Sequence, residues 1–130
     1  MILLDTDVCI HLLRGNRNVI KNRRNYPDEV AISFMTVAEL YYGVEKSANP
    51  RKNKTVLEQF LLTVRIFHSN RKITSRFGQL KADLENSGTP LADADLLIAA
   101  TALETSNLLV TGNIKHYQRI DNLNLENWIS

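Results

Sequence analysis

Residues 2–13 have the sequence ILLDTDVCIHLL, an apolar run followed at once by two carboxylates, Asp5 and Asp7. Apolar residues 2–4 are costly to leave in water, whereas a carboxylate is costly to bury in a dry core without a partner. A strand whose carboxyl end opens into a cleft resolves this conflict, because its apolar side chains are covered and the acid lies just beyond them. This stretch therefore predicts a buried strand, then a helix, with Asp5 at the junction.

The alternation of strand and helix continues along the chain. The predicted strands cover residues 2–5, 29–33, 66–68, 108–111 and 123–126, and the predicted helices cover residues 6–14, 18–25, 36–46, 50–64, 73–86 and 93–106. Strands that alternate with helices favour a parallel sheet with helices on both faces. No repeat, low-complexity segment or linker interrupts the pattern. We therefore expect an α/β fold, with one domain over residues 1–130: an α/β/α sandwich with a small, mostly parallel central sheet.

The composition fits such a domain. Of the 130 residues, 44% are hydrophobic and 23% are charged, and the formal net charge of +2 is only mildly basic. The single cysteine, Cys9, excludes an internal disulfide and suits a reducing compartment, so we expect a cytoplasmic protein. No apolar run approaches membrane-spanning length, and no basic region precedes the first apolar stretch as it would in a signal peptide. We therefore expect no membrane partner.

Acidic and polar residues recur where ligands bind in such sheets, beyond the carboxyl ends of the strands. Asp5 ends the first strand, and Glu39 lies in the first turn of the helix after the second. Thr111 ends the fourth strand, and Asn113 follows it two positions later. Asp95 lies near the start of a later helix that is apolar on every side. Acids brought together raise each other's pKa unless a cation lies between them. An all-oxygen set of ligands suits Mg²⁺ or Mn²⁺ better than Zn²⁺.

Two of these acids also have a structural interpretation. Thr36 and Glu39 have the spacing of a capping box, in which the Glu39 carboxylate would bond back to the Thr36 amide. Asp93 and Asp95 lie on roughly opposite sides of their helix, so they cannot easily face one ligand. We assign Asp93 as the N-cap of that helix and Asp95 as the functional acid, and capping remains the alternative for Glu39 and Asp95.

Five segments, taken in order, resemble the PIN-domain ribonucleases, and most closely the VapC toxins of bacterial toxin–antitoxin pairs. They are LLDTDVCIHLL, SFMTVAELYYGVEKS, GTPLADADLLIAATAL, LLVTGNIKHYQRI and the final LENW. The resemblance covers nearly the whole chain. It implies a metal-dependent endoribonuclease that uses Mg²⁺, or Mn²⁺, to cleave RNA with an activated water. It also implies a homodimer and a cognate antitoxin that blocks the cleft.

The resemblance also assigns roles to individual residues. It implies that Asp5, Glu39 and Asp95 hold the metal and carry out catalysis. A fourth acid often follows the fourth strand in this family, and here that position holds the neutral Asn113. Four further residues are expected to act as auxiliary groups around the ligands: Asn113, Thr111, Asp93 and Asp7.

A basic segment follows the first predicted helix. Residues 14–24 contain five cations and no acid, namely Arg14, Arg17, Lys21, Arg23 and Arg24. Such a run can bind RNA phosphates and make affinity depend on salt. A solvated helix face is the alternative interpretation.

Three other classes of protein share parts of this pattern. Asp5-Thr6-Asp7-Val8 is similar to the start of a haloacid-dehalogenase phosphatase motif, but Cys9 departs from it and the chain is short for that class. A receiver domain needs an acceptor aspartate after its middle strand, and residues 66–68 offer none. A catalytically inactive PIN-like module that binds RNA or a protein remains the main alternative.

Overall fold

A computed structural model describes all residues from 1 to 130. Its centre is a five-stranded sheet in the order β3-β2-β1-β4-β5, and every neighbouring pair is parallel. The strands are β1 (Ile2–Leu4), β2 (Val30–Ser33), β3 (Arg65–Phe67), β4 (Leu108–Val110) and β5 (Leu125–Glu126). The predicted parallel sheet is confirmed.

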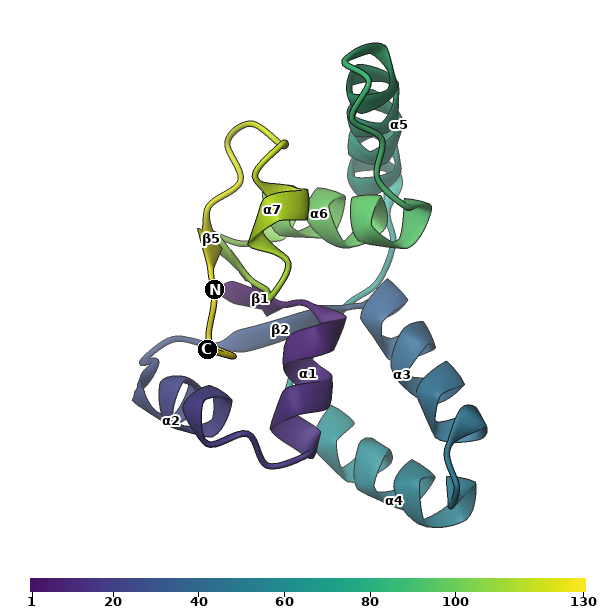
Figure 1. The fold of residues 1–130 in the computed structure, drawn as a ribbon, viewed down its shortest axis with the longest axis vertical. Helices are drawn as coiled ribbons and strands as arrows, with labels where there is room; N and C mark the ends of the chain where they lie inside the picture. Colours follow the sequence, from purple (N-terminus) through teal and green to yellow (C-terminus); the bar gives the residue numbers. More distant parts are fainter.

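Seven helices cover the two faces of the sheet. They are α1 (Thr6–Leu13), α2 (Arg17–Asn25), α3 (Phe34–Lys46), α4 (Pro50–Leu61), α5 (Arg71–Asn86), α6 (Asp93–Thr105) and α7 (Ile114–Tyr117). In Figure 1, helices α1 to α4 lie below the sheet and helices α5 to α7 lie above it. The sandwich expected from the sequence is therefore present. None of these helices combines the length and apolar character needed to cross a bilayer.

The two layers follow from the alternation of side chains along each strand. Ile2 and Leu4 pack in one hydrophobic cluster, which also includes side chains from helices α1 to α4. Leu3 points the other way, into a second cluster with side chains from α5, α6 and α7. Each cluster packs one layer of helices against the sheet, and the single cysteine, Cys9, is fully buried in the first cluster.

Most element boundaries fall within a few residues of the prediction, and two differences matter for function. Asp5 was expected to end the first strand, but it is the N-cap of α1, and its side chain accepts a hydrogen bond from the Thr6 amide. The four-residue helix α7 was not predicted, because so short a segment shows no helical period in the sequence. Both differences place polar side chains at the carboxyl edge of the sheet.

Candidate active site

Asp5 is the centre of a group of polar residues at the carboxyl ends of β1 and β4. Its side chain is only 3% exposed. Its Oδ1 accepts a hydrogen bond from the Thr6 amide at 2.8 Å, and its Oδ2 accepts one from the Thr111 hydroxyl at 2.7 Å. Because β1 and β4 are parallel neighbours, the residues that follow them meet at one edge of the sheet. The two hydrogen bonds formed there hold the Asp5 carboxylate in one orientation.

Asp95 joins Asp5 through a residue that the sequence did not predict to lie there. The Tyr117 hydroxyl lies 3.4 Å from Asp5 Oδ1 and 3.3 Å from Asp95 Oδ1. Asp95 lies in the first turn of α6, and Tyr117 ends α7. Two acids that are 90 positions apart in the chain therefore contact one hydroxyl group, as expected if they share a site.

Glu39 faces the same edge but has a different partner. The Thr6 hydroxyl donates to Glu39 Oε1 at 2.7 Å and lies 3.0 Å from the Thr36 hydroxyl. Thr6 has only one hydroxyl proton, so Thr36 must donate to Thr6, which donates to Glu39. Glu39 is thereby held toward the start of α1.

The capping-box interpretation of Glu39 is wrong. Helix α3 begins earlier than predicted, and its N-cap is Ser33, whose Oγ accepts from the Met35 amide at 3.1 Å. Thr36 is consequently a buried residue inside the first turn, and its amide is not the group that Glu39 satisfies.

The prediction that Asp93 caps α6 is also wrong. The cap position has extended backbone, and here it is occupied by Ala92, which offers no side-chain hydrogen bond. Asp93 is therefore already helical and exposed, and its carboxylate pairs with Lys81 Nζ at 3.0 Å. It does not contact Asp5 or Asp95.

The other predicted auxiliary residues separate into three roles. Thr111 contacts Asp5 directly through its hydroxyl. Asn113 is exposed, and its backbone amide, not its side chain, bonds to Thr111 Oγ1 at 2.9 Å. Asp7 accepts hydrogen bonds from the amides of Val8 at 2.8 Å and Gly112 at 3.0 Å, so it links α1 to the end of β4.

None of the acids at this edge forms an ion pair with a Lys or Arg side chain. Burial raises the pKa of Asp5 to about 7, and the charges of Asp7 and Asp95 add to this against the opposing hydrogen bonds from Thr111 and Thr6. Burial also raises the pKa of Asp7, although the amides of Gly112 and Val8 oppose the change. The three ion pairs of the structure all lie elsewhere.

The donor chemistry of this site fits a hard divalent cation, although the three acids do not form a closed set of ligands. No three His, Cys, Asp or Glu side chains lie close enough together to hold a metal ion, and Glu39 is hydrogen-bonded to Thr6. Asp95 Oδ2 has no hydrogen bond, and Asp5 Oδ2 has one, which leaves lone pairs free on both carboxylates. Oxygen donors and uncompensated negative charge suit Mg²⁺ or Mn²⁺.

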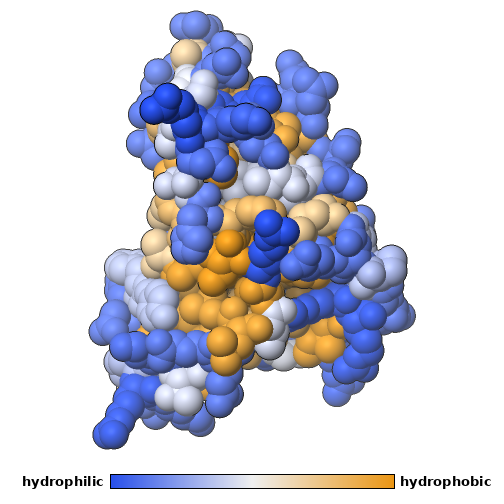
Figure 2. Space-filling view, turned by 180° about the vertical axis from the view of Figure 1, so that it is seen from behind, coloured by the Kyte–Doolittle hydropathy of each residue, from blue (hydrophilic) through white to orange (hydrophobic).

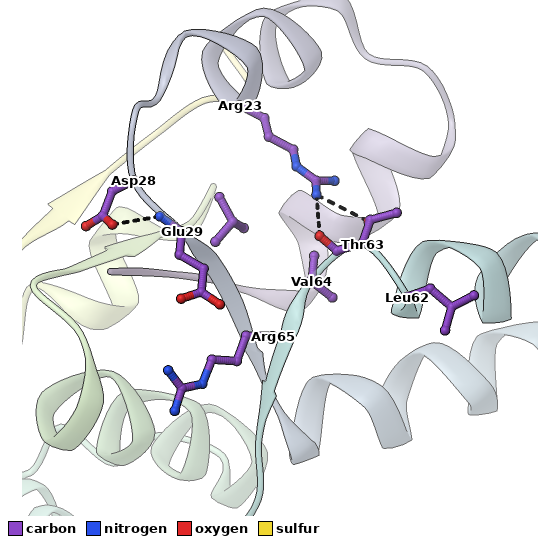
Figure 3. A pocket seen from close by; sticks show the side chains of 8 residues that line it. Arg23, Asp28, Glu29, Leu62, Thr63, Val64 and Arg65 are labelled. Atoms are coloured by element: carbon purple, nitrogen blue, oxygen red, sulfur yellow. Dashed lines mark hydrogen bonds between the residues drawn. The ribbon is translucent and has the colours of Figure 1, made fainter.

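The predicted RNA-binding cations lie at different ends of the molecule. Arg14 and Glu39 line one groove between α1, α3 and α4. Arg23 instead extends from α2 toward the amino ends of β2 and β3, where its guanidinium donates to Thr63 (Figure 3). The other three, Arg17, Lys21 and Arg24, are exposed along α2. Of the five cations, only Arg14 lines the same groove as a proposed ligand.

Comparison with known proteins agrees with this fold. The model of the PIN domain family matches residues 2–123, and the chain belongs to the PIN-domain family. It is 37% identical over 129 residues to Ribonuclease VapC2 of Rickettsia felis, covering 97% of this chain and 96% of that protein. It is 32% identical over 127 residues to the tRNA(fMet)-specific endonuclease VapC of Salmonella typhimurium, covering 97% of this chain and 96% of that protein.

The solved structures agree with the sequence comparison. VapBC2 from Rickettsia felis, bound to a DNA fragment from its promoter, superposes with a TM-score of 0.92 and 38% identity over 98% of this chain and 99% of that chain. DNA-bound VapBC from Salmonella typhimurium gives a TM-score of 0.91 and 30% identity, over 98% and 97% of the two chains. The resemblance to VapC proteins inferred from the five segments is confirmed.

Proposed function

We propose that this chain is a metal-dependent endoribonuclease and the toxin of a toxin–antitoxin pair. One observation carries the proposal: two carboxylates without a cationic partner, the buried Asp5 and the half-buried Asp95, meet at the carboxyl edge of a parallel sheet. Sequence similarity supports it, since proteins named as VapC ribonucleases align with nearly the whole chain.

Each acid has a role in the proposed reaction. Asp5 and Asp95 hold the cation, and Glu39 completes the set directly or through water. A bound Mg²⁺ supplies positive charge that acidifies the attacking water and offsets the charge that builds on the phosphate. Glu39 or Asp95 accepts the proton of that water. Thr111 holds the Asp5 carboxylate in place through its 2.7 Å hydrogen bond. Cleavage leaves 5′-phosphate and 3′-hydroxyl ends.

The basic residues are proposed to hold the RNA. Arg14 lines the same groove as Glu39, so its guanidinium is proposed to bind a phosphate of RNA that lies along this groove. Arg17, Lys21 and Arg24 extend this positive charge along α2. Arg23 was predicted to belong to this group, but its side chain is already bonded to Thr63, so it contributes least.

The proposed partners are an antitoxin and a second copy of this chain. The similar solved structures support the antitoxin, because they are described as VapBC pairs or as members of toxin–antitoxin systems. The surface supports a homodimer, because Figure 2 shows a continuous apolar area on one face of the molecule. A domain over residues 1–130 acting on RNA in the cytoplasm is the setting we propose for the activity.

Cleavage of total cellular RNA tests the proposed reaction. The assay compares wild type, Asp5→Asn and Asp121→Asn in Mg²⁺, in Mn²⁺ and in EDTA. Asp121 is an exposed acid with no hydrogen bond, so its replacement controls for loss of one negative charge. We expect discrete, metal-dependent fragments from wild type and Asp121→Asn only. If the folded, antitoxin-free wild type cleaves no RNA, the inactive binding module is the better description.

A further inference from the structure

The Tyr117 hydroxyl contacts two of the three proposed metal ligands at once. It lies 3.4 Å from Asp5 Oδ1 and 3.3 Å from Asp95 Oδ1, and no other hydrogen bond is made by this hydroxyl. The two acids come from different elements: Asp5 follows β1, and Asp95 lies in the first turn of α6. Tyr117 is therefore the direct connection between them.

Packing alone does not explain a tyrosine at this position. The side chain is fully buried and belongs to the cluster that contains Leu109 and Leu96. A phenylalanine would fill almost the same volume and avoid burying a hydroxyl, which is costly unless it is bonded. Here the bonding partners of the hydroxyl are the two acids and nothing else. The hydroxyl of Tyr117 thus contacts the two acids, and its ring packs in the hydrophobic cluster.

The positions of the free oxygen atoms indicate what the contact achieves. Tyr117 occupies Oδ1 of both carboxylates, and the Thr6 amide also binds Oδ1 of Asp5. Asp95 Oδ2 keeps both of its lone pairs, and Asp5 Oδ2 keeps one beside its bond from Thr111. The hydroxyl has one proton, so Tyr117 donates to one Oδ1 at a time or shares the proton between the two. In either case it holds both Oδ1 atoms beside it, which leaves the two Oδ2 atoms for a cation. Groups that orient ligands in this way commonly set metal affinity.

We propose that Tyr117 is a positioning residue whose hydroxyl pre-organises Asp5 and Asp95 to bind the divalent cation. The inference rests on the proposed metal site and adds a determinant of its affinity. The hydroxyl touches neither the phosphate nor the water in this scheme, so it acts only through the two carboxylates. The measurable consequence is weaker metal binding by a protein that still folds.

Metal binding without RNA is the direct test. Calorimetric titration with Mn²⁺ compares wild type, Tyr117→Phe and Tyr41→Phe. Tyr41 is a matched control, because its hydroxyl also bonds a carboxylate, Glu58 at 3.2 Å, but away from the site. We expect Mn²⁺ affinity to fall about tenfold or more in Tyr117→Phe and to stay unchanged in Tyr41→Phe. Thermal melting of both metal-free variants checks that each is folded.

A spectroscopic measurement on wild type gives an independent test if Tyr117→Phe fails to fold. Saturation with Mn²⁺ should change the near-ultraviolet absorption of one buried tyrosine, because the acids bonded to its hydroxyl gain a cation. No tyrosine signal, or equal Mn²⁺ affinity in wild type and Tyr117→Phe, overturns the role of Tyr117 and leaves the metal site standing. A wild type that binds no Mn²⁺ overturns both.

Discussion

Asp7 Oδ2 accepts a hydrogen bond from the backbone amide of Gly112 at 3.0 Å, and this bond joins the first turn of α1 to the end of β4. The two residues are 105 positions apart in the chain. The bond adjoins Thr111, which holds Asp5. Asp7 therefore supports the site through the backbone, and its acid group is used for structure.

Gly112→Ala should destabilise the protein. A Cβ at this position would lie 2.7 Å from Asp7 Oδ2 and 2.7 Å from Ile129 Cδ1, which is too close for either contact. Ile129 can turn its methyl group away, but Asp7 is held by two amides and must give up one. We expect a loss of about 1 to 3 kcal/mol in the free energy of unfolding, measured with urea.

Gly78→Ala is the matched control. Gly78 lies inside α5, and no atom lies within 4 Å of the place that an alanine Cβ would take. Alanine should therefore stabilise the helix by about 0.5 to 1 kcal/mol. The same substitution is thus expected to have opposite signs at the two sites. Equal effects at both would show that Asp7 moves away without cost.

The metal-free protein should lose stability as pH rises from about 4 to 7. Folding raises the pKa of Asp5 from 3.8 to about 7, mainly because the group is buried. Over this interval the folded chain binds a proton that the unfolded chain has released, so the free energy of unfolding falls with pH. The contribution of Asp5 is at most about 4 kcal/mol, since a tenfold change in proton affinity is about 1.4 kcal/mol.

Asp5→Asn isolates this contribution. Melting temperatures of the metal-free proteins between pH 5 and pH 8 should fall steeply for wild type and less for the variant. At pH 8 the variant should be the more stable protein, and added Mg²⁺ should stabilise wild type alone. Parallel pH profiles for the two proteins would mean that Asp5 is already neutralised by another group.

The sequence predicts the parts of this site that depend on neighbouring residues. An apolar run that ends in Asp5 predicts a buried strand with the acid at its carboxyl end, and in the structure Asp5 directly follows the buried strand β1. Strands in alternation with helices likewise predict a parallel sheet, and hence the edge at which Asp5 and Thr111 meet.

The contacts that complete the site are not encoded locally. Thr6 lies 33 positions before Glu39, and Tyr117 lies 112 positions after Asp5, so no spacing in the sequence connects either pair. Helix α7 is too short to show a helical period in the sequence, so the sequence did not predict toward which side Tyr117 points. The one available signal was a tyrosine, rather than an aliphatic residue, close behind Thr111.

Ser33→Ala and Glu39→Gln should separate capping from chemistry in α3. Ser33 is the N-cap, so its loss should cost about 1 kcal/mol of stability. Glutamine at position 39 can still accept the hydrogen bond from Thr6, so stability should change by less than about 0.5 kcal/mol. Cleavage should fall strongly in Glu39→Gln only. Urea unfolding and RNA cleavage, measured on both variants, check this. A large loss of stability in Glu39→Gln would show that the Glu39 carboxylate has a structural role.

Arg23 and Arg14 should respond in opposite ways to replacement by alanine. The Arg23 guanidinium donates to the Thr63 carbonyl at 2.9 Å and lies 5.9 Å from the centre of the Phe60 ring, so it fastens α2 to the end of α4 (Figure 3). Arg23→Ala should cost about 1 to 2 kcal/mol of stability and leave RNA affinity nearly unchanged.

Arg14→Ala should weaken RNA binding without destabilising the fold. The Arg14 side chain is exposed, makes no hydrogen bond, and lines the groove that also contains Glu39. Loss of one phosphate contact should reduce the slope of log affinity against log salt by about 0.7 for single-stranded RNA. Binding to inactive Asp5→Asn protein at several salt concentrations measures this slope without cleavage. If Arg23→Ala reduces the slope and Arg14→Ala does not, RNA follows the amino end of the sheet, away from the acids.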